Sequence, residues 1–100
     1  MANHIEAAVA PYHRRVLLAQ VRDHGSLSLS ELTEAMVREI ASTEQCQLET
    51  VNKKRVRARL YHIDIPLFAD LGLLLYDKKS QWVSPTAALY SLNPTLLSIG

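Results

Sequence analysis

Cysteine, glycine and catalytic motifs are scarce in this 100-residue sequence. Cys46 is its single cysteine, so no disulfide can form within the chain, which favours a reducing, intracellular setting. We interpret Cys46 as a small apolar residue that is at least half-buried, with a redox sensor as the alternative. There is no Gly-rich phosphate loop, no Gly-x-Ser-x-Gly elbow and no His-Glu-x-x-His pair. The histidines lack metal-ligand spacing: His4, His13, His24 and His62. The sequence therefore predicts no enzyme, no metal and no cofactor.

Long hydrophobic runs are absent as well. The longest uncharged stretch, residues 80–100, is interrupted by Pro85 and Pro94 and is a poor membrane span. The first residues have no basic start followed by an apolar run, so we expect no secretory signal and a cytoplasmic protein. Apolar residues still make up 48% of the chain, enough for the core of one domain.

Net charge is small, +1, but it is unevenly distributed. Residues 1–50 hold four Lys/Arg and seven Asp/Glu, a net charge of −3, whereas residues 51–100 hold seven and three, a net charge of +4. Fields between exposed charges are screened within about 10 Å at moderate salt, so the local excess matters more than the total. This asymmetry favours an anionic partner for the second half of the chain.

Local signals predict the elements of the first half. We expect a leader or an extra helical turn over residues 1–10 and a helix over residues 11–24, which Gly25 ends. Residues 26–28 read as a short edge strand. A second helix, from Ser28 to about residue 42, begins with a capping box in which Ser28 pairs with Glu31. Residues 43–48 are predicted to be a connection or a frayed extension of the second helix.

The second half is predicted to hold a third helix, a hairpin and a short last helix. The third helix begins with Thr50 as its N-cap and runs to about residue 64, and Pro66 predicts a kink near residues 63–65. Helix resumes over residues 67–71 and stops at Gly72. Residues 73–84 form a hairpin with a basic turn, anchored on the core by Tyr76 and Trp82. Ser84-Pro85 is predicted to start the last helix, residues 86–92, before a break at residues 93–94.

This order predicts a mainly α protein with a small β-hairpin, the winged helix-turn-helix arrangement. We assign residues 11–84 to that domain and residues 85–100 to a C-terminal helix and tail. The apolar tail has two interpretations. It forms a dimer interface together with the first helix, which is the one we favour, or it packs on its own domain.

Several runs of residues also carry a resemblance to a known family. Residues 14–18, 27–32, 55–63 and 65–73, with Leu60-Tyr61-His62 followed by Pro66 and then by Ala69-Asp70-x-Gly72, resemble an archaeal, largely haloarchaeal, family of winged-helix regulators. That family is similar to arsenical-repressor-type winged helices. The resemblance covers roughly residues 11–84 and implies the fold, with a regulatory function. Haloarchaeal domains are usually strongly acidic, so the near-neutral charge points to a virus or a less salt-adapted host, and a lone Cys46 offers no metal-sensing cluster.

The chemistry of the third helix rests on five basic residues within positions 53–59. On a helical wheel Val56, Leu60, Ile63 and Leu67 form the buried stripe. The small residue Ala58 lies on the opposite face, flanked by Lys54, Arg55, Arg57, Tyr61 and His62. Lys53 and Arg59 fall nearer the core boundary, and we expect Arg59 to pair with Glu31 or Glu34. One of Arg14 and Arg15 is expected to make an internal salt bridge. At the hairpin tip, Lys78 and Lys79 are candidates for phosphate contacts.

The sequence thus predicts a sequence-specific transcriptional regulator, a dimeric repressor that binds double-stranded DNA and acts by operator occupancy. With four to six phosphate contacts, log affinity would fall with log salt at a slope of about −4 to −5. A solvated basic face and a turn kept polar for solubility are the plainer interpretations. The functional alternative is a protein-interaction winged helix in a larger assembly. No small-molecule ligand is evident in the sequence.

Overall fold

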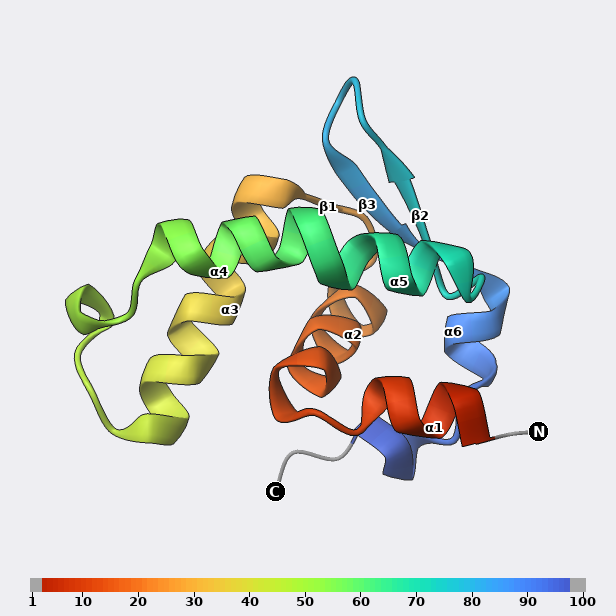
Figure 1. Ribbon diagram of the computed structural model, residues 1–100, viewed down its shortest axis with the longest axis horizontal. Helices are drawn as coiled ribbons and strands as arrows, with labels where there is room; N and C mark the ends of the chain where they lie inside the picture. Colours follow the sequence, from red (N-terminus) through yellow and green to blue (C-terminus); the bar gives the residue numbers. More distant parts are fainter. Residues whose placement is uncertain (1–2, 98–100) are drawn as a thin grey trace.

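The computed structural model describes residues 3–97, and it is mainly helical with a small sheet (Figure 1). The elements in the first half are α1 (Asn3–Val9), α2 (Tyr12–His24), β1 (Leu27–Ser28), α3 (Leu29–Glu44) and the 3₁₀ turn η1 (Leu48–Thr50). They are followed by α4 (Lys53–Arg59), the π-helical turn η2 (Leu60–Asp64), α5 (Ile65–Asp70), β2 (Leu74–Asp77), β3 (Trp82–Pro85), α6 (Ala87–Ser91) and the 3₁₀ turn η3 (Pro94–Leu97). The predicted class, mainly α with a β-hairpin, is confirmed, and the layout is compatible with the predicted order.

Ser28 caps α3 in the predicted way. Its hydroxyl accepts a hydrogen bond from the Glu31 N–H at 3.0 Å, and the Glu31 carboxylate accepts one from the Ser28 N–H at 3.0 Å. Hydrogen bonding to the carboxylate, first from the Ser28 backbone N–H and then from the Ser28 side chain, holds the pKa of Glu31 below its usual value. The box satisfies two N–H groups that would otherwise lack partners, which fixes where α3 begins.

Two predicted helix caps were wrong, whereas the end of α3 agrees with one of the two interpretations. This helix extends to Glu44, two residues into the segment predicted as a connection or as an extension of the helix. Thr50 lies in η1, and α4 is capped instead by Asn52, whose side chain accepts from the Arg55 N–H at 3.0 Å. Ser84 and Pro85 belong to β3, and Thr86 is the cap of α6 because its hydroxyl accepts from the Leu89 N–H. In both helices the cap used lies two residues after the predicted one.

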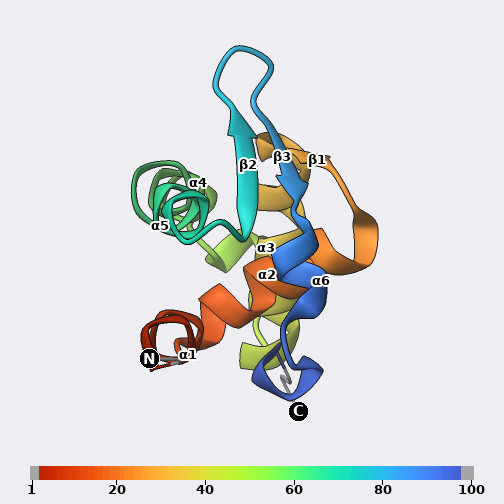
Figure 2. The same cartoon turned by 90° about the vertical axis from the view of Figure 1, so that its right-hand side faces the viewer.

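The sheet has three antiparallel strands in the order β1-β3-β2. Leu27 of β1 pairs with Val83 of β3, and Tyr76 of β2 pairs with the same residue on its other side. The hairpin of β2 and β3 extends well beyond the helical body, and Figure 2 shows it standing clear of α4 and α5. Val83 is fully buried whereas Trp82 is 43% exposed, so the expectation that Trp82 anchors the hairpin on the core was wrong.

The core includes residues from both ends of the described chain. Val16, Leu17, Leu18 and Val21 of α2 lie at its centre, with Leu29, Leu32 and Met36 of α3 against them. Val9 of α1, Leu89 of α6 and Leu97 of η3 are buried in the same cluster. The tail therefore packs on its own domain, which was the second interpretation; Ile99 lies outside the described residues. Dimerisation stays a prediction, without the tail's apolar residues as its reason.

The π turn η2 changes which residues of the long helical segment are buried. The Ile65 N–H donates to the carbonyl of Leu60, five residues back. This turn takes one residue more than an α-helical turn, so every later position is shifted by one. Asp64 and Phe68 occupy the buried positions predicted for Ile63 and Leu67. Ile63 is 51% exposed, so its assignment to the buried stripe was wrong.

The turn also lies where Pro66 predicted a distortion. Proline lacks an N–H and its ring clashes with the carbonyl four residues earlier, so a regular α-helix through Pro66 is unfavourable. The structure accommodates it through the wider turn, and α4, η2 and α5 follow one another across the front of the molecule in Figure 1. The exposed surface of the helical segment from α4 to α5 therefore continues below the hairpin.

Candidate nucleic-acid interface

One open groove brings together most of the predicted contact residues. It lies between α4, the start of α3 and the end of the hairpin turn, has a volume of about 350 Å³, and we name it the α4–hairpin groove. Its lining consists of Leu29, Lys54, Arg57, Ala58, Tyr61, His62 and Gln81. Five of the six residues placed on the outward face of the helix by the wheel are in this set. Ala58 lies among longer side chains, so the backbone of α4 is accessible there.

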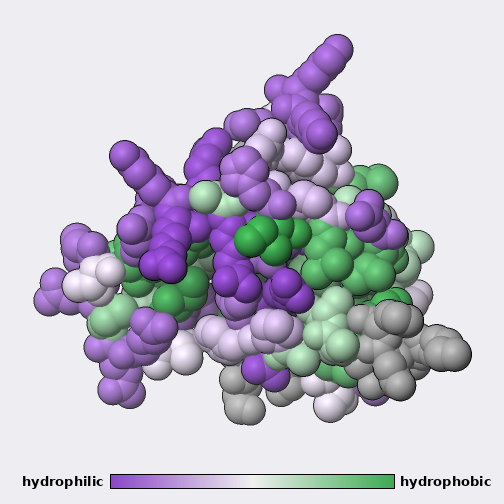
Figure 3. Space-filling view, in the orientation of Figure 1, coloured by the Kyte–Doolittle hydropathy of each residue, from purple (hydrophilic) through white to green (hydrophobic). Residues whose placement is uncertain are grey.

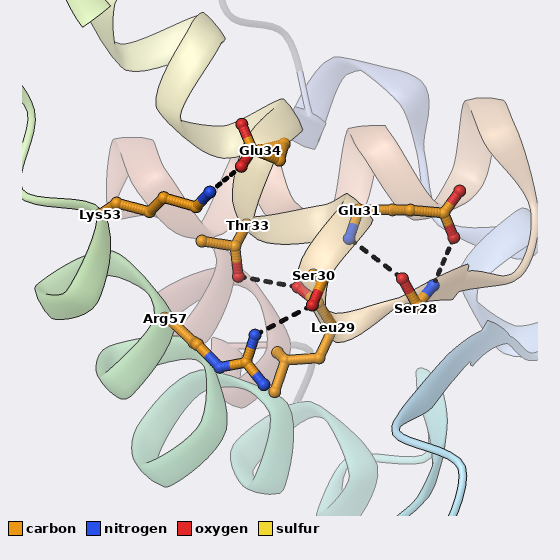
Figure 4. A network of polar contacts seen from close by, with 8 residues as sticks. All are labelled: Ser28, Leu29, Ser30, Glu31, Thr33, Glu34, Lys53 and Arg57. Atoms are coloured by element: carbon orange, nitrogen blue, oxygen red, sulfur yellow. Dashed lines mark hydrogen bonds and ion pairs between the residues drawn. The ribbon is translucent and has the colours of Figure 1, made fainter. Parts of the chain in front are cut away.

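Arg57 links three elements that frame the groove. Its guanidinium donates to the Ser30 hydroxyl at 3.0 Å and to the Gln81 side-chain oxygen at 3.4 Å. Ser30 lies in the first turn of α3, and Gln81 directly precedes β3, so Arg57 holds α4 against both (Figure 4 shows the contact with Ser30). Both partners are neutral, so the positive charge of Arg57 is not cancelled. Its partners are 27 and 24 residues away, and no local sequence signal reveals them.

The two basic residues set apart by the wheel do form ion pairs. Lys53 pairs with Glu34 of α3, as Figure 4 shows. Arg59 pairs with an acid as predicted, but the partner is Asp64 at 3.5 Å and neither of the two glutamates suggested, Glu31 and Glu34. Asp64 is 1% exposed and also accepts from Arg14 of α2 at 3.1 Å. The expected internal salt bridge from Arg14 or Arg15 is thus made by Arg14.

Arg55 is the predicted contact residue that the structure separates from the others. It lines a second groove on the opposite side of α4, towards α2 and α3, together with Tyr12 and Met36. Its neighbours in sequence, Lys54 and Arg57, line the α4–hairpin groove. The basic charge of α4 is therefore divided between two faces of the helix.

Lys78 extends the basic face on to the hairpin. It lines a hollow next to the α4–hairpin groove, together with Tyr76 of β2. Tyr61 and His62 line both the hollow and the groove. The rings of Tyr61 and Tyr76 meet edge-to-face with centroids 6.1 Å apart. The Tyr76 hydroxyl is buried without a hydrogen-bond partner among the described residues, and burial raises its pKa. A protonated phenol and an ammonium group thus face one hollow.

Lys79 lies in the turn at the hairpin tip. Its backbone N–H donates to the Asp77 carboxylate at 3.0 Å, while its side chain is exposed. Hydrogen bonds from the Ser80 side chain and from the Lys79 N–H lower the pKa of Asp77, so the turn is fixed by an ionised carboxylate. Gln81 adopts a left-handed backbone conformation, with a φ of 59°, where the chain enters β3.

The surface that holds these residues is unlike its surroundings. In the space-filling view, hydrophilic side chains gather over α4 and at the hairpin tip, and hydrophobic ones lie over α5 beside them (Figure 3). Charged and polar groups thus cover one continuous face, from the helix to the tip.

These features define a class of protein. It is a small helical domain with a three-stranded antiparallel sheet and a basic helix beneath a projecting hairpin. The sequence matches over residues 8–84 the family described as Domain of unknown function (DUF7344), and the chain belongs to that family. No curated protein and no solved structure matches it. Among the described residues, no helix is long and apolar enough to cross a membrane.

Proposed function

We propose that this protein is a winged helix-turn-helix transcriptional regulator that binds double-stranded DNA. In this proposal α3 and α4 are the helix-turn-helix pair, α4 enters the major groove, and β2 and β3 form the wing. The observation that carries it is the shared α4–hairpin groove, where Lys54, Arg57, Tyr61 and His62 surround the small residue Ala58. The structure supports the proposal by geometry, since this face is both cationic and accessible.

The dimensions and chemistry of the face suit DNA. A major groove about 12 Å wide admits one α-helix, and a small residue at the centre of its outer face permits close approach to base edges. Lys54 is exposed and, in the described part of the chain, has no ion-pair partner, so its ammonium group is available to a phosphate. Arg57 suits a guanine or a phosphate while it keeps α4 in place.

The wing supplies the second set of contacts in this proposal. Lys78 and Lys79 lie at the end of the hairpin that projects furthest from the helical body (Figure 2). A hairpin beside an inserted helix runs along the adjacent backbone, where such residues neutralise phosphates. Repression by operator occupancy is the simplest mechanism for such a domain, and a homodimer would place two α4 helices about 34 Å apart, one DNA turn.

The test is binding to a labelled random-sequence duplex, measured by fluorescence anisotropy at low salt. Wild-type protein is compared with Lys54→Glu/Lys78→Glu, which reverses one charge on the helix and one on the hairpin. Arg22→Glu/Arg38→Glu is the matched control, because it changes the net charge equally at residues of α2 and α3 that line neither the groove nor the hairpin. Binding by wild type and control but not by the first variant supports the proposal. Equal loss in both variants would show that only total charge matters.

The alternative, a protein-interaction module, rests on a different face of the hairpin. Leu75 is 63% exposed and Trp82 is 43% exposed. Leu75 pairs with Ser84 and Asp77 pairs with Trp82, so both apolar side chains point to the same side of the sheet. Exposed neighbouring apolar residues of this kind are typical of protein contacts. Failure of the wild type to bind any duplex at micromolar concentration would favour this function.

A further inference from the structure

A second and larger groove lies behind α4, on the side away from the hairpin. Its volume is about 610 Å³, within the range of about 300–1,000 Å³ that small-molecule sites occupy. Residues of α2, α3, η1, α4 and η2 form its walls, and we name it the rear groove. In Figure 1, α2 and α3 lie below α4, and residues of these three helices line the rear groove.

The lining of the rear groove includes a continuous apolar set. Met36 and Leu60 are buried, and Ile40 and Val56 are half-buried. Cys46, also half-buried as predicted, lies at the same groove. Apolar side chains from two facing helices without a further layer over them favour an apolar occupant.

The charged residues that line the rear groove are two arginines, Arg55 and Arg59, and two carboxylates, Glu44 and Asp64. Arg55 forms no ion pair with any residue of the described chain, and Arg59 has Asp64 as its partner. Asp64 is held by Arg14 as well, so two guanidinium groups offset one carboxylate. Glu44, at the end of α3, is the remaining acidic group at the groove. Arg55 is thus the charge available to an anion.

The surroundings of the His13 side chain indicate the sign of the electrostatic potential at the rear groove. Its Nε2 atom is buried and has no hydrogen-bond partner among the described residues. Burial and then the charge of Arg59 lower the pKa of His13, with a further contribution from Arg14, against the opposing effect of Asp64. The ring is therefore neutral near pH 7, and it lies where positive charge prevails. A positive field at the wall of the groove favours a carboxylate ligand over an ammonium ligand.

We propose that the rear groove binds a small amphipathic carboxylate, with its apolar body against Met36, Ile40 and Val56 and its carboxylate near Arg55 and His13. This binding does not depend on whether the protein binds DNA. The occupant would nevertheless touch the back of α4, the helix whose other side carries Lys54 and Arg57.

The experiment uses octanoate as the probe and follows the backbone amides of the ¹⁵N-labelled chain by NMR. Octanol and octylammonium share its chain but carry no charge or the opposite charge. We expect saturable shifts centred on residues of the rear groove, with octanoate bound most tightly and octylammonium most weakly. Arg55→Gln should weaken octanoate binding about three- to tenfold and leave octanol unchanged. Lys54→Gln, which removes the same charge from the other side of α4, should bind octanoate like the wild type.

Cys46 provides a second readout in the unmodified protein. As the only cysteine of the chain and a residue of the groove, it should be alkylated by iodoacetamide more slowly when octanoate is bound. Equal affinity for the three probes, equal loss in Lys54→Gln and Arg55→Gln, or shifts centred on Leu75 and Trp82 would each overturn the proposal. Absence of saturable shifts together with unprotected Cys46 would overturn it as well.

Discussion

The division of basic charge between the two sides of α4 makes a quantitative prediction. Lys54 lines the α4–hairpin groove and Arg55 lines the rear groove, although they are adjacent in sequence. If α4 enters DNA with its hairpin side, Lys54→Gln should lose a phosphate contact and Arg55→Gln should lose none. The two variants have the same net charge, so any difference between them measures position and not total charge.

The expected size follows from counterion release. Four basic side chains lie on the proposed DNA side, Lys54, Arg57, Lys78 and Lys79, so log affinity should fall with log salt at a slope of about −3.6 per bound protomer. Lys54→Gln should reduce the magnitude of that slope by about 0.9. Extrapolated from 1 M salt, one such contact is worth about eightfold in affinity at 0.1 M salt.

Fluorescence anisotropy titrations of a labelled duplex at four or more salt concentrations give both slopes. The reasoning predicts a slope for Arg55→Gln within error of the wild type. Equal slopes for the two variants, both lower in magnitude than the wild type, would refute the assignment of faces to α4. A wild-type affinity that does not change with salt would refute phosphate contacts altogether.

Three further predictions concern stability, each measured by urea unfolding. Asp64→Asn should lower the unfolding free energy by about 2–3 kcal/mol, because Arg14 is left half-buried without its partner, and a loss equal to that of the exposed Asp70→Asn would contradict this. Ser28→Ala should cost about 1 kcal/mol through loss of the α3 cap, and an unchanged midpoint would exclude a stabilising role for the capping box. Because the pKa of His13 is lowered in the folded protein, the unfolded chain binds more protons than the folded one. The contribution of His13 to the unfolding free energy is therefore complete above the ordinary pKa of 6.5 and is lost as the pH falls through the lower folded pKa. Between pH 7 and pH 5 the unfolding free energy of the wild type should therefore fall by more than that of His13→Gln. The same pH dependence in both proteins would contradict this role of His13.

Much of the fold was predictable because its signals are local. Capping boxes, proline and glycine act within a turn or two of the chain, and they correctly predicted the starts of α2 and α3 and the position of the hairpin. The misplaced caps of α4 and α6 show the limit of this reasoning. Several residues in each stretch could serve as a cap, and the one used depends on packing.

The candidate site was predictable only in part. The wheel correctly grouped Lys54, Arg57 and Ala58, which precede the π turn and share an α-helical register, and also Tyr61 and His62 at the start of that turn. From Ile63 onward the wheel fails, because a regular 100° step does not hold through the wider turn. The rear groove was not predicted at all. Its lining residues lie up to 52 positions apart in the chain, from Tyr12 to Asp64, and no periodicity describes them.

The sequence by itself determined the order of helices and strands, the capping of α3 and the cationic character of α4, since each depends on neighbours within a few positions. Only the tertiary structure decided which of those charges are free. Arg57 bridges to Ser30 and Gln81, Arg59 and Arg14 converge on Asp64, and Lys53 turns to Glu34. Such pairings depend on how α2, α3 and the hairpin pack against α4, because the partners lie far apart in the chain. Of the five basic residues at positions 53–59, Lys54 and Arg57 thus lie on one side of the helix and Arg55 on the other, while Lys53 and Arg59 are held in ion pairs.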